Sequence, residues 1–296
     1  MIHRAGLGIA CIVGAATFYG IVPNFARAAY LNGVPPLEST LFRTVLLALI
    51  FSILALFQNQ RLSIPRQALP SFALQTLATL LVSIGYLTSV QFIPVGVAVM
   101  IFFFFPVLIV MFSPVIEGRI PSLLQIGVAI VAFCGLVIAI GPSLHGLDMR
   151  GVLLAAVASG GGALQAFSGR AISRYMAPSV FGSLVHAFMV PVLLTLVFIV
   201  GDGSLQALPG GTANHAGIAF MTALGGVYVI AYMLHMLSLR YAPASTVAPY
   251  FNLEPVVTTA LAASVLGERL QVNQYAGGSL ILSALLAMNL IGKPKS

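Results

Sequence analysis

The residue that most needs a chemical explanation is Glu254, which precedes Pro255 in the apolar stretch VAPYFNLEPVVTTALAA at residues 247–263. Inside a membrane-spanning helix, a carboxylate costs at least ~2.5–3.5 kcal/mol on insertion scales, so it usually faces a cavity or a partner. Pro255 has no N–H, so a backbone carbonyl one turn earlier loses its usual donor and can face the same cavity. We interpret this pair as part of a polar cavity wall. The alternative is a protonated Glu254 that hydrogen-bonds a neighbouring helix and only fixes packing.

Polar and aromatic side chains elsewhere recur at the spacing of a helix face. Tyr250, Glu254 and Thr258 are four residues apart and therefore share one face of a helix. Two further stripes of this kind occur in other apolar stretches, and they consist of Thr79, Ser83 and Tyr86, and of Tyr228, Tyr232 and His235. We expect all three sets to line one substrate cavity. An ordinary interhelical hydrogen bond, worth under ~1–2 kcal/mol, explains any single member equally well.

Arg43 and His186 are two further titratable residues within apolar stretches. Arg43 could attract the carboxylate of Glu254 or of a substrate, or it could extend its side chain to the membrane surface. His186 is most often a neutral hydrogen-bonding group near neutral pH, and it could also share a proton with a partner. Both are candidate charge partners of the cavity.

The composition decides the solvent in which these residues must be positioned. Of the 296 residues, 59% are hydrophobic and only 6% are charged, and the mean hydropathy is +1.06. A soluble domain averages about 25% charged residues, so this chain cannot cover its surface in water and must be an integral membrane protein. The formal charge of +7 comes from 13 basic residues that are spread along the chain, which argues against a nucleic-acid site.

Apolar runs of about 20 residues, the length that crosses a bilayer, divide the chain into ten predicted spans. Turn-forming residues separate them, such as the Asn-Gly-Val-Pro-Pro of residues 32–36. The predicted fold is therefore an all-α membrane protein with ten transmembrane helices. The predicted spans cover residues 5–29, 37–57, 70–92, 95–116, 121–141, 151–173, 178–200, 215–240, 244–266 and 272–292.

Basic residues beside the spans predict the orientation, because cytoplasmic loops carry an excess of Lys and Arg. With a cytoplasmic N-terminus, the inner side receives Arg4, Arg61, Arg66, Arg119, Arg170, Arg174, Arg240, Lys293 and Lys295, and the outer side receives Arg27, Arg150 and Arg269. We therefore predict that both termini are cytoplasmic. The first apolar run could be a cleaved signal peptide, but it is longer than a signal core and has a counterpart in an internal repeat.

Three successive displacements align the two halves of the sequence: 143 residues, then 149, then 150. The matched pairs are Arg27 with Arg170, Pro35 with Pro178, Arg43 with His186, Pro94 with Pro243, Pro106 with Pro255, Arg119 with Arg269 and Gly127 with Gly277. Because each half holds five spans, the second half enters the membrane upside down, which is the inverted repeat of many secondary transporters. We predict that residues 1–145 and 146–296 are two five-helix repeats that form one transport domain around a central cavity.

Several of these features together resemble the drug/metabolite transporter (DMT) superfamily, EamA type. They are the 5+5 duplication, Pro106 and Pro255 midway along their spans, the Glu-Pro before small residues, and the LGERL of residues 266–270. Within that superfamily the chain is most similar to YddG-type bacterial exporters of amino acids and metabolites. The resemblance implies a basket of ten helices in the bacterial inner membrane, without an ATPase domain or covalent chemistry. One difference is that Phe105 occupies the position that corresponds to Glu254.

The sequence lacks a phosphate-binding glycine loop, an HExxH motif and a Gly-x-Ser-x-Gly motif. We therefore predict a non-enzymatic transporter without a cofactor or metal, which exports small organic metabolites by alternating access. Amino acids, including aromatic ones, are the expected substrates, and protons are a candidate coupling ion. The competing hypotheses are a nucleotide-sugar or drug carrier of the same superfamily, an intramembrane enzyme, and a non-transporting membrane scaffold. A nucleotide-sugar carrier would need several cations in its cavity, and only Arg43 offers one.

Cysteines and glycines within the spans have simpler explanations. Cys11 and Cys134 lack metal or redox spacing, and we expect both to be small buried residues. The glycines at 160–162 and 225–226 should let neighbouring helices approach closely.

The predicted orientation places the loop that contains Leu205 outside the cell. In a variant without Cys11 and Cys134, a Leu205→Cys substitution should react with a membrane-impermeant thiol reagent added to intact cells. Reaction of this cysteine only after the reagent reaches the cytoplasm would overturn the orientation.

Overall fold

The computed structural model describes residues 2–89, 92–93, 95–141, 147–200, 205–206, 211, 213–266 and 271–291. Within these ranges the chain is helical and contains no strand. Several residues used in the sequence predictions lie outside the described residues, namely Pro94, Lys293, Lys295 and the Gly267–Leu270 part of the LGERL motif.

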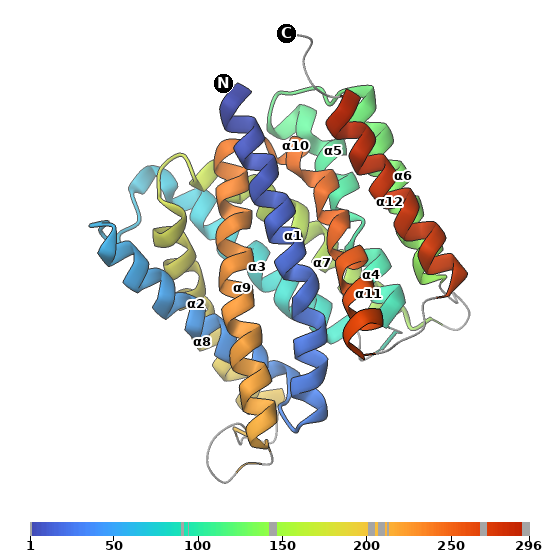
Figure 1. The fold of residues 1–296 in the computed structure, drawn as a ribbon. Coiled ribbons are helices and arrows are strands. Elements are labelled where there is room, and N and C mark those ends of the chain that lie inside the picture. The colour runs from blue at the N-terminus through green and yellow to red at the C-terminus, as the bar shows by residue number, and fades with distance from the viewer. Residues whose placement is uncertain are drawn as a thin grey trace.

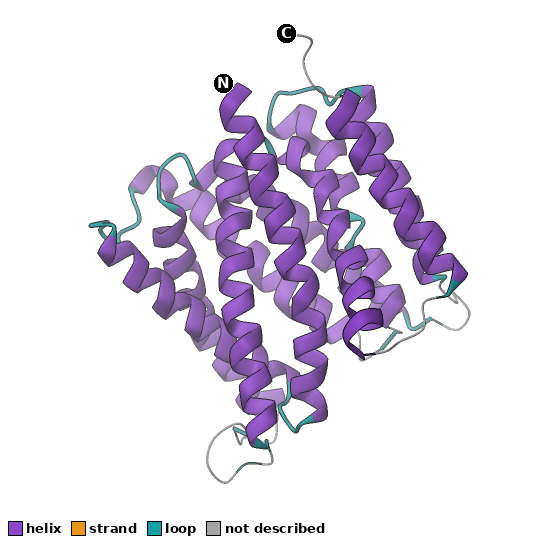
Figure 2. Ribbon diagram, viewed as in Figure 1, coloured by secondary structure: helices purple, strands orange, loops and turns teal. Residues whose placement is uncertain are grey.

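The helices form a single bundle in which both termini lie at the same end (Figure 1). Figure 2 shows that the described connections between the long helices lie at the two ends of the bundle. The long helices are α1 (Ile2–Leu31), α2 (Pro36–Phe57), α3 (Leu69–Ser89), α6 (Leu123–Ile140), α7 (Met149–Ile172), α8 (Pro178–Val200), α9 (His215–Tyr241) and α12 (Val272–Ile291). The shorter ones are η1 (Arg66–Ala68), α4 (Val95–Phe102), α5 (Phe105–Ile116), α10 (Ala244–Val247), η2 (Ala248–Asn252) and α11 (Leu253–Leu266).

Each predicted span corresponds to one helix or to one interrupted helix, and the described ends differ from the predicted ones by three residues or fewer. Eight helical segments of the described chain are long and apolar enough to cross a membrane: α1, α2, α3, the joined α4–α5, α6, α7, α8 and α9. The segment from α10 to α11 and the helix α12 fall outside that set. The number of ten membrane crossings therefore stays a prediction.

The fourth and ninth spans are interrupted at corresponding places. The fourth span breaks at Phe103 and Phe104, between α4 and α5. A displacement of 149 residues carries this break to residues 252–253, and there the 3₁₀ turns of η2 end and α11 begins. The structure thus has the same interruption in both halves, in agreement with the register of the sequence repeat.

Helix packing follows the same repeat. The repeat relates α1 to α7, α2 to α8, α3 to α9, α4–α5 to α10–α11, and α6 to α12. α1 packs extensively on α9, and the related pair, α7 and α3, packs in the same way. α2 packs on α8, and α6 packs on α12. In each of these two pairs a helix packs on its own counterpart in the other half. This pattern is that of two halves around a two-fold axis between α2 and α8 and between α6 and α12.

Two groups of helices follow from these contacts. α1 packs on α9 and α11, and we call α1, α9 and α10–α11 the α1 bundle. α7 packs on α3, α4 and α5, and we call α7, α3 and α4–α5 the α7 bundle. Each bundle combines helices from both halves of the sequence. In the α1 bundle, α1 comes from the first half and the other helices come from the second. In the α7 bundle, α7 comes from the second half and the other helices come from the first.

The outer surface of the bundle is apolar, as a bilayer requires. Large hydrophobic side chains are exposed along it, for example Leu123 with 88% and Val115 with 84% of their surface. Cys11 is buried, but the prediction that Cys134 is also buried is wrong, because Cys134 lies on the exposed face of α6. A small apolar residue at this surface needs no buried partner when the surroundings are lipid.

Glycines permit close helix contacts at some of the predicted positions and not at others. A Cβ atom on Gly161 would meet α3 at Leu81, and one on Gly225 would meet Leu46 of α2. Gly160 and Gly226 face open space, so the close-packing explanation is wrong for these two.

Candidate functional site

The two interrupted spans meet at the centre of the bundle. Phe105 begins α5 and Phe251 lies in η2, and their ring centroids are 5.0 Å apart in an edge-to-face contact. Pro106 and Pro255 lie in the first turns of α5 and α11. A residue there has no N–H bond to the preceding turn to lose, so proline fits at these positions. The interruptions therefore lie just before the two prolines that were predicted to break the helices.

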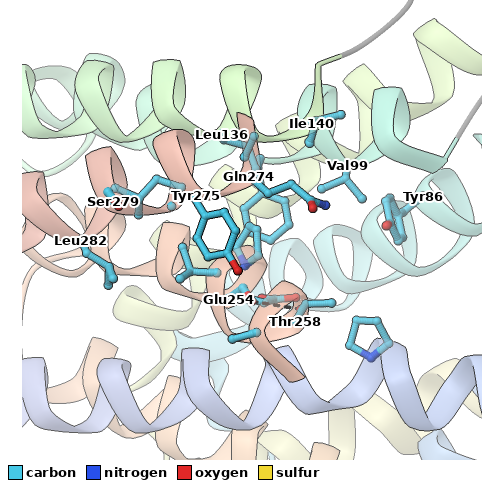
Figure 3. A pocket seen from close by; sticks show the side chains of 18 residues that line it. Tyr86, Val99, Leu136, Ile140, Glu254, Thr258, Gln274, Tyr275, Ser279 and Leu282 are labelled. Atoms are coloured by element: carbon cyan, nitrogen blue, oxygen red, sulfur yellow. Dashed lines mark hydrogen bonds between the residues drawn. The ribbon is translucent and has the colours of Figure 1, made fainter. Parts of the chain in front are cut away.

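A cavity of about 530 Å³ lies beside this junction, toward the end of the bundle that is opposite the termini. A cavity of this size suits a small organic ligand. Most of its lining is apolar, and its polar lining comes from α3, α11 and α12 (Figure 3). Of the residues predicted to form the cavity, Tyr86, Glu254, Pro255 and Thr258 line it. Gln274, Tyr275 and Ser279 line it as well and were not predicted, because they resemble interfacial polar residues at the start of a span.

Glu254 is the one formally charged side chain among the described residues that line this cavity. It is half-buried, and in the described part of the chain no Lys, Arg or His forms an ion pair with it. Figure 3 shows Tyr275 pointing from α12 toward Glu254, with Tyr86 across the cavity. A carboxylate in such a place needs either a proton or a cation from outside the protein.

The prediction that Tyr250 shares a helix face with Glu254 and Thr258 is wrong. Tyr250 lies in the 3₁₀ turns of η2 and is 2% exposed, whereas the other two lie in α11. A 3₁₀ helix has three residues per turn, so a spacing of four residues no longer keeps side chains aligned. Glu254 and Thr258 do share a face, and Thr258 Oγ1 donates to the backbone carbonyl of Glu254 at 3.0 Å.

The stripe on α9 packs into an aromatic cluster outside the wall of the described cavity. The ring of Tyr19, on α1, contacts Tyr228 edge-on at 5.4 Å and His235 at 6.0 Å between centroids. The Tyr19 hydroxyl lies 3.4 Å from His235 Nδ1. Tyr232 is 1% exposed and stacks on Tyr228 at 6.4 Å. In this conformation Tyr232 and His235 therefore do not share the cavity of Tyr86.

Arg43 and His186 each contact a ring of this aromatic cluster. The guanidinium carbon of Arg43 lies 4.3 Å from the centroid of the Tyr228 ring, a cation–π geometry. His186 Nδ1 lies 2.7 Å from the carbonyl oxygen of Gly182, and the His186 ring contacts Tyr232 edge-on at 4.7 Å. Neither side chain pairs with Glu254 in the described structure.

The stripe on α3 joins a polar contact between helices. Thr79 Oγ1 donates to the Gln75 carbonyl at 2.7 Å and accepts from Gln165 Nε2 at 3.0 Å. Ser168 Oγ donates to Gln75 Oε1 at 2.6 Å, so α3 and α7 are joined by two side-chain hydrogen bonds. For Thr79 the structure thus shows an interhelical hydrogen bond. Ser83, on the same helix, is buried, and neither residue is part of the lining of the described cavity. Gln75 and Gln165 were not predicted, although amides in apolar helices are a usable signal.

A carboxylate joins the two bundles at the end where the termini lie. Glu117 follows α5, in the α7 bundle, and its Oε1 accepts from the backbone N–H of Ala244 at 2.9 Å. Its Oε2 accepts from Ser245 Oγ at 3.0 Å. These donors lie in the first turn of α10, in the α1 bundle, where backbone N–H groups lack intrahelical acceptors and favour negative charge.

A guanidinium makes the complementary contact nearby. Arg170 Nη1, near the end of α7, donates at 2.7 and 2.8 Å to two carbonyls at the C-terminal end of α9. Carbonyls at this end of a helix lack intrahelical donors and favour a cation. Arg170 and Glu117 therefore hold the α7 bundle to the α1 bundle at the termini end. Neither contact was predicted from the sequence, where Arg170 served only for the orientation and for the repeat, as the counterpart of Arg27.

Among the described residues, the opposite end of the bundle shows no equivalent of these two contacts. α7 packs on α9, and α5 packs on α10, but the pairs that the repeat relates to these are α1 with α3 and α4 with α11. In the described ranges these two pairs make little or no contact. Pro23 of α1, Tyr86 of α3 and Val99 of α4 instead line the cavity together with Glu254 of α11. The two bundles are therefore closed at the termini end and separated by the cavity at the other.

Comparisons with known proteins agree with a duplicated chain. The sequence model of the EamA-like transporter family matches residues 6–141 and again residues 149–290. A solved crystal structure, described only as that of a protein, is 17% identical to this chain, covers 99% of each chain and superposes with a TM-score of 0.80. It is one of 29 chains of solved structures that match. No curated protein matches the sequence.

The contact between Glu117 and α10 should stabilise the described conformation. In a cycle of Glu117→Ala, Ser245→Ala and the double variant, we expect a coupling of about 1.5–3 kcal/mol in the free energy of unfolding in detergent, as for a hydrogen bond to a charged group. Strictly additive effects of the two substitutions would contradict the contact.

Proposed function

The chain belongs to the EamA-like transporter family of the DMT superfamily, and from this premise we propose that it is a secondary transporter that works by alternating access. It moves a small organic metabolite through the cavity beside Glu254. Residues 1–145 and 146–296 act as two inverted repeats of one transport domain. Both termini are cytoplasmic, so the cavity of the described conformation opens to the outside of the bacterial inner membrane.

One observation carries this proposal: a duplicated fold is closed at one end and open at the other. In a fully symmetric structure each contact between helices would occur twice. The contact of α7 with α9 would recur between α1 and α3, and the contact of α5 with α10 would recur between α11 and α4. They do not recur in the described structure. Exchange of these contacts between the ends would open the cavity to the cytoplasm, which is the movement expected of inverted repeats.

The cavity wall supports a solute that carries an ammonium group and an apolar body. Glu254 supplies a negative charge, and the rings of Tyr86, Phe103 and Tyr275 supply aromatic surface. Amino acids, including aromatic ones, combine these two features, and we propose their export. Arg43, the cation that a nucleotide-sugar carrier would use, lies over Tyr228 instead of in this cavity.

A matched set of ligands tests the solute. We expect purified protein to bind 2-phenylethylamine and L-phenylalanine but not 3-phenylpropionate, which lacks the amine, in isothermal calorimetry. Glu254→Gln should weaken binding of 2-phenylethylamine by about tenfold or more, because a hydrogen bond to a charged group is lost. Uptake of L-phenylalanine into proteoliposomes then tests transport itself. Equal binding of 3-phenylpropionate would contradict the proposal that the site recognises an ammonium group. Uptake no greater than in empty liposomes would contradict the proposal that the protein is a transporter.

The response of transport to a pH gradient should depend on Glu254, since among the described residues that line the cavity it is the charged group without a protein partner. Glu254→Gln keeps the shape of the side chain and should fold normally. We expect this variant to lose any response of transport to a pH gradient while it keeps some downhill exchange. Glu254→Ala should reduce both transport and stability. An unchanged response to the gradient in Glu254→Gln would make Glu254 a packing residue.

A further inference from the structure

Two polar atoms next to the central junction are buried without a hydrogen-bond partner among the described residues. They are His235 Nε2 on α9 and Asn252 Oδ1 at the end of η2. His235 is 5% exposed and Asn252 is not exposed at all. The other polar atoms of these side chains are paired, because Asn252 Nδ2 donates to the Pro249 carbonyl at 3.1 Å and His235 Nδ1 lies by the Tyr19 hydroxyl. A buried polar atom without a hydrogen bond has lost its contact with water and gained nothing in return, so each of these atoms needs an explanation.

The repeat relates these two residues to the wall of the open cavity. A displacement of 149 residues carries Tyr86 to His235 and Phe103 to Asn252, and both Tyr86 and Phe103 line the cavity. The structure supports this register independently. The Tyr86 ring lies 5.2 Å from Phe102, and the His235 ring lies 4.8 Å from Phe251, which is the residue that corresponds to Phe102. Four buried side-chain atoms lack a partner among the described residues, on Ser159, Tyr232, His235 and Asn252. Of these four residues, only His235 and Asn252 correspond to residues that line the open cavity, so they would line the cavity that the two-fold axis relates to it.

In the described conformation, no cavity is open at the position that the two-fold axis relates to the open cavity. That position lies between the two bundles on the side of the junction that faces the termini. There, the contact of Glu117 with α10 and the contact of Arg170 with α9 hold the bundles together. α10 leads directly into η2, which carries Asn252, and Arg170 binds the end of the helix that carries His235. Separation of these contacts would therefore expose both residues at once.

We propose that His235 and Asn252 line a second solute site, concealed in this structure, which opens toward the termini when the contacts of Glu117 and Arg170 separate. The inference rests on the proposed alternating access. The site offers neutral hydrogen-bonding atoms, His235 Nε2 and Asn252 Oδ1, to the polar group of the solute. Phe105 stands where the open cavity has Glu254, so the second site holds the apolar body of the solute against an aromatic ring.

Cysteine accessibility tests the site without the need for transport. In protein that lacks Cys11 and Cys134, Asn252→Cys should react with a membrane-impermeant thiol reagent applied from the termini side of sealed vesicles. Adding Glu117→Ala should raise its reaction rate about tenfold, because the loss of hydrogen bonds to a carboxylate destabilises the closed end. His235→Cys provides a second reporter in case Asn252→Cys fails to fold. Gln60→Cys, in an exposed loop at the termini end, identifies the orientation of the vesicles.

Ser159→Cys is the matched control. Ser159 Oγ is also buried without a partner among the described residues, but the residue that corresponds to it, Ala16, does not line the cavity. We expect Ser159→Cys to remain unreactive with and without Glu117→Ala. Ser279→Cys, in the open cavity, should react from the opposite side and more slowly once Glu117→Ala is added.

The outcomes separate the inference from the proposed function. If both Asn252→Cys and His235→Cys stay as unreactive as Ser159→Cys in the Glu117→Ala background, the unpaired atoms are packing atoms and the second site does not exist. If they react from the termini side while no solute of the phenylalanine set enters proteoliposomes, the second site stands and the proposed solute is wrong.

Discussion

Lipid offers no hydrogen-bond partner to a peptide group, and this constraint governs where the helices of this bundle can be interrupted. Both interruptions lie in the interior, where Phe105 and Phe251 meet and where a cavity begins. Because a new helix begins directly after each break, a proline fits in its first turn. In the second half, Glu254 lies next to that proline. The aromatic core, the cavity and the position of Glu254 all depend on this internal placement of the breaks.

Helix positions could be predicted from sequence because hydrophobic length and turn residues act locally. The predicted span 215–240 differs from α9 by a single residue, and the repeat register was accurate enough to relate the break at Phe103 to that at Asn252. Tyr250 could not be placed in the same way. Its spacing from Glu254 assumes an α-helix, and only the tertiary packing around the junction shows that the backbone winds into 3₁₀ turns there.

The candidate site was only partly predictable, since a stripe of residues defines a face but not what lies opposite. Tyr86 and Glu254 do line one cavity, whereas Tyr232 meets His186 and Phe51. Glu117 escaped notice because a carboxylate in a short loop looks like a solvated residue. Its role depends on the first turn of α10, which is 127 residues away in the chain.

The pairing of α2 with α8 and of α6 with α12 has a consequence for the origin of the chain. Each pair joins a helix to its own counterpart, so each is an isologous interface of the kind found in symmetric dimers. A polypeptide with only one half would carry both of these self-complementary surfaces and could assemble with a copy inserted in the opposite sense. In a single chain each half can differ from the other, so the carboxylate of Glu254 in one half is matched by the ring of Phe105 in the other.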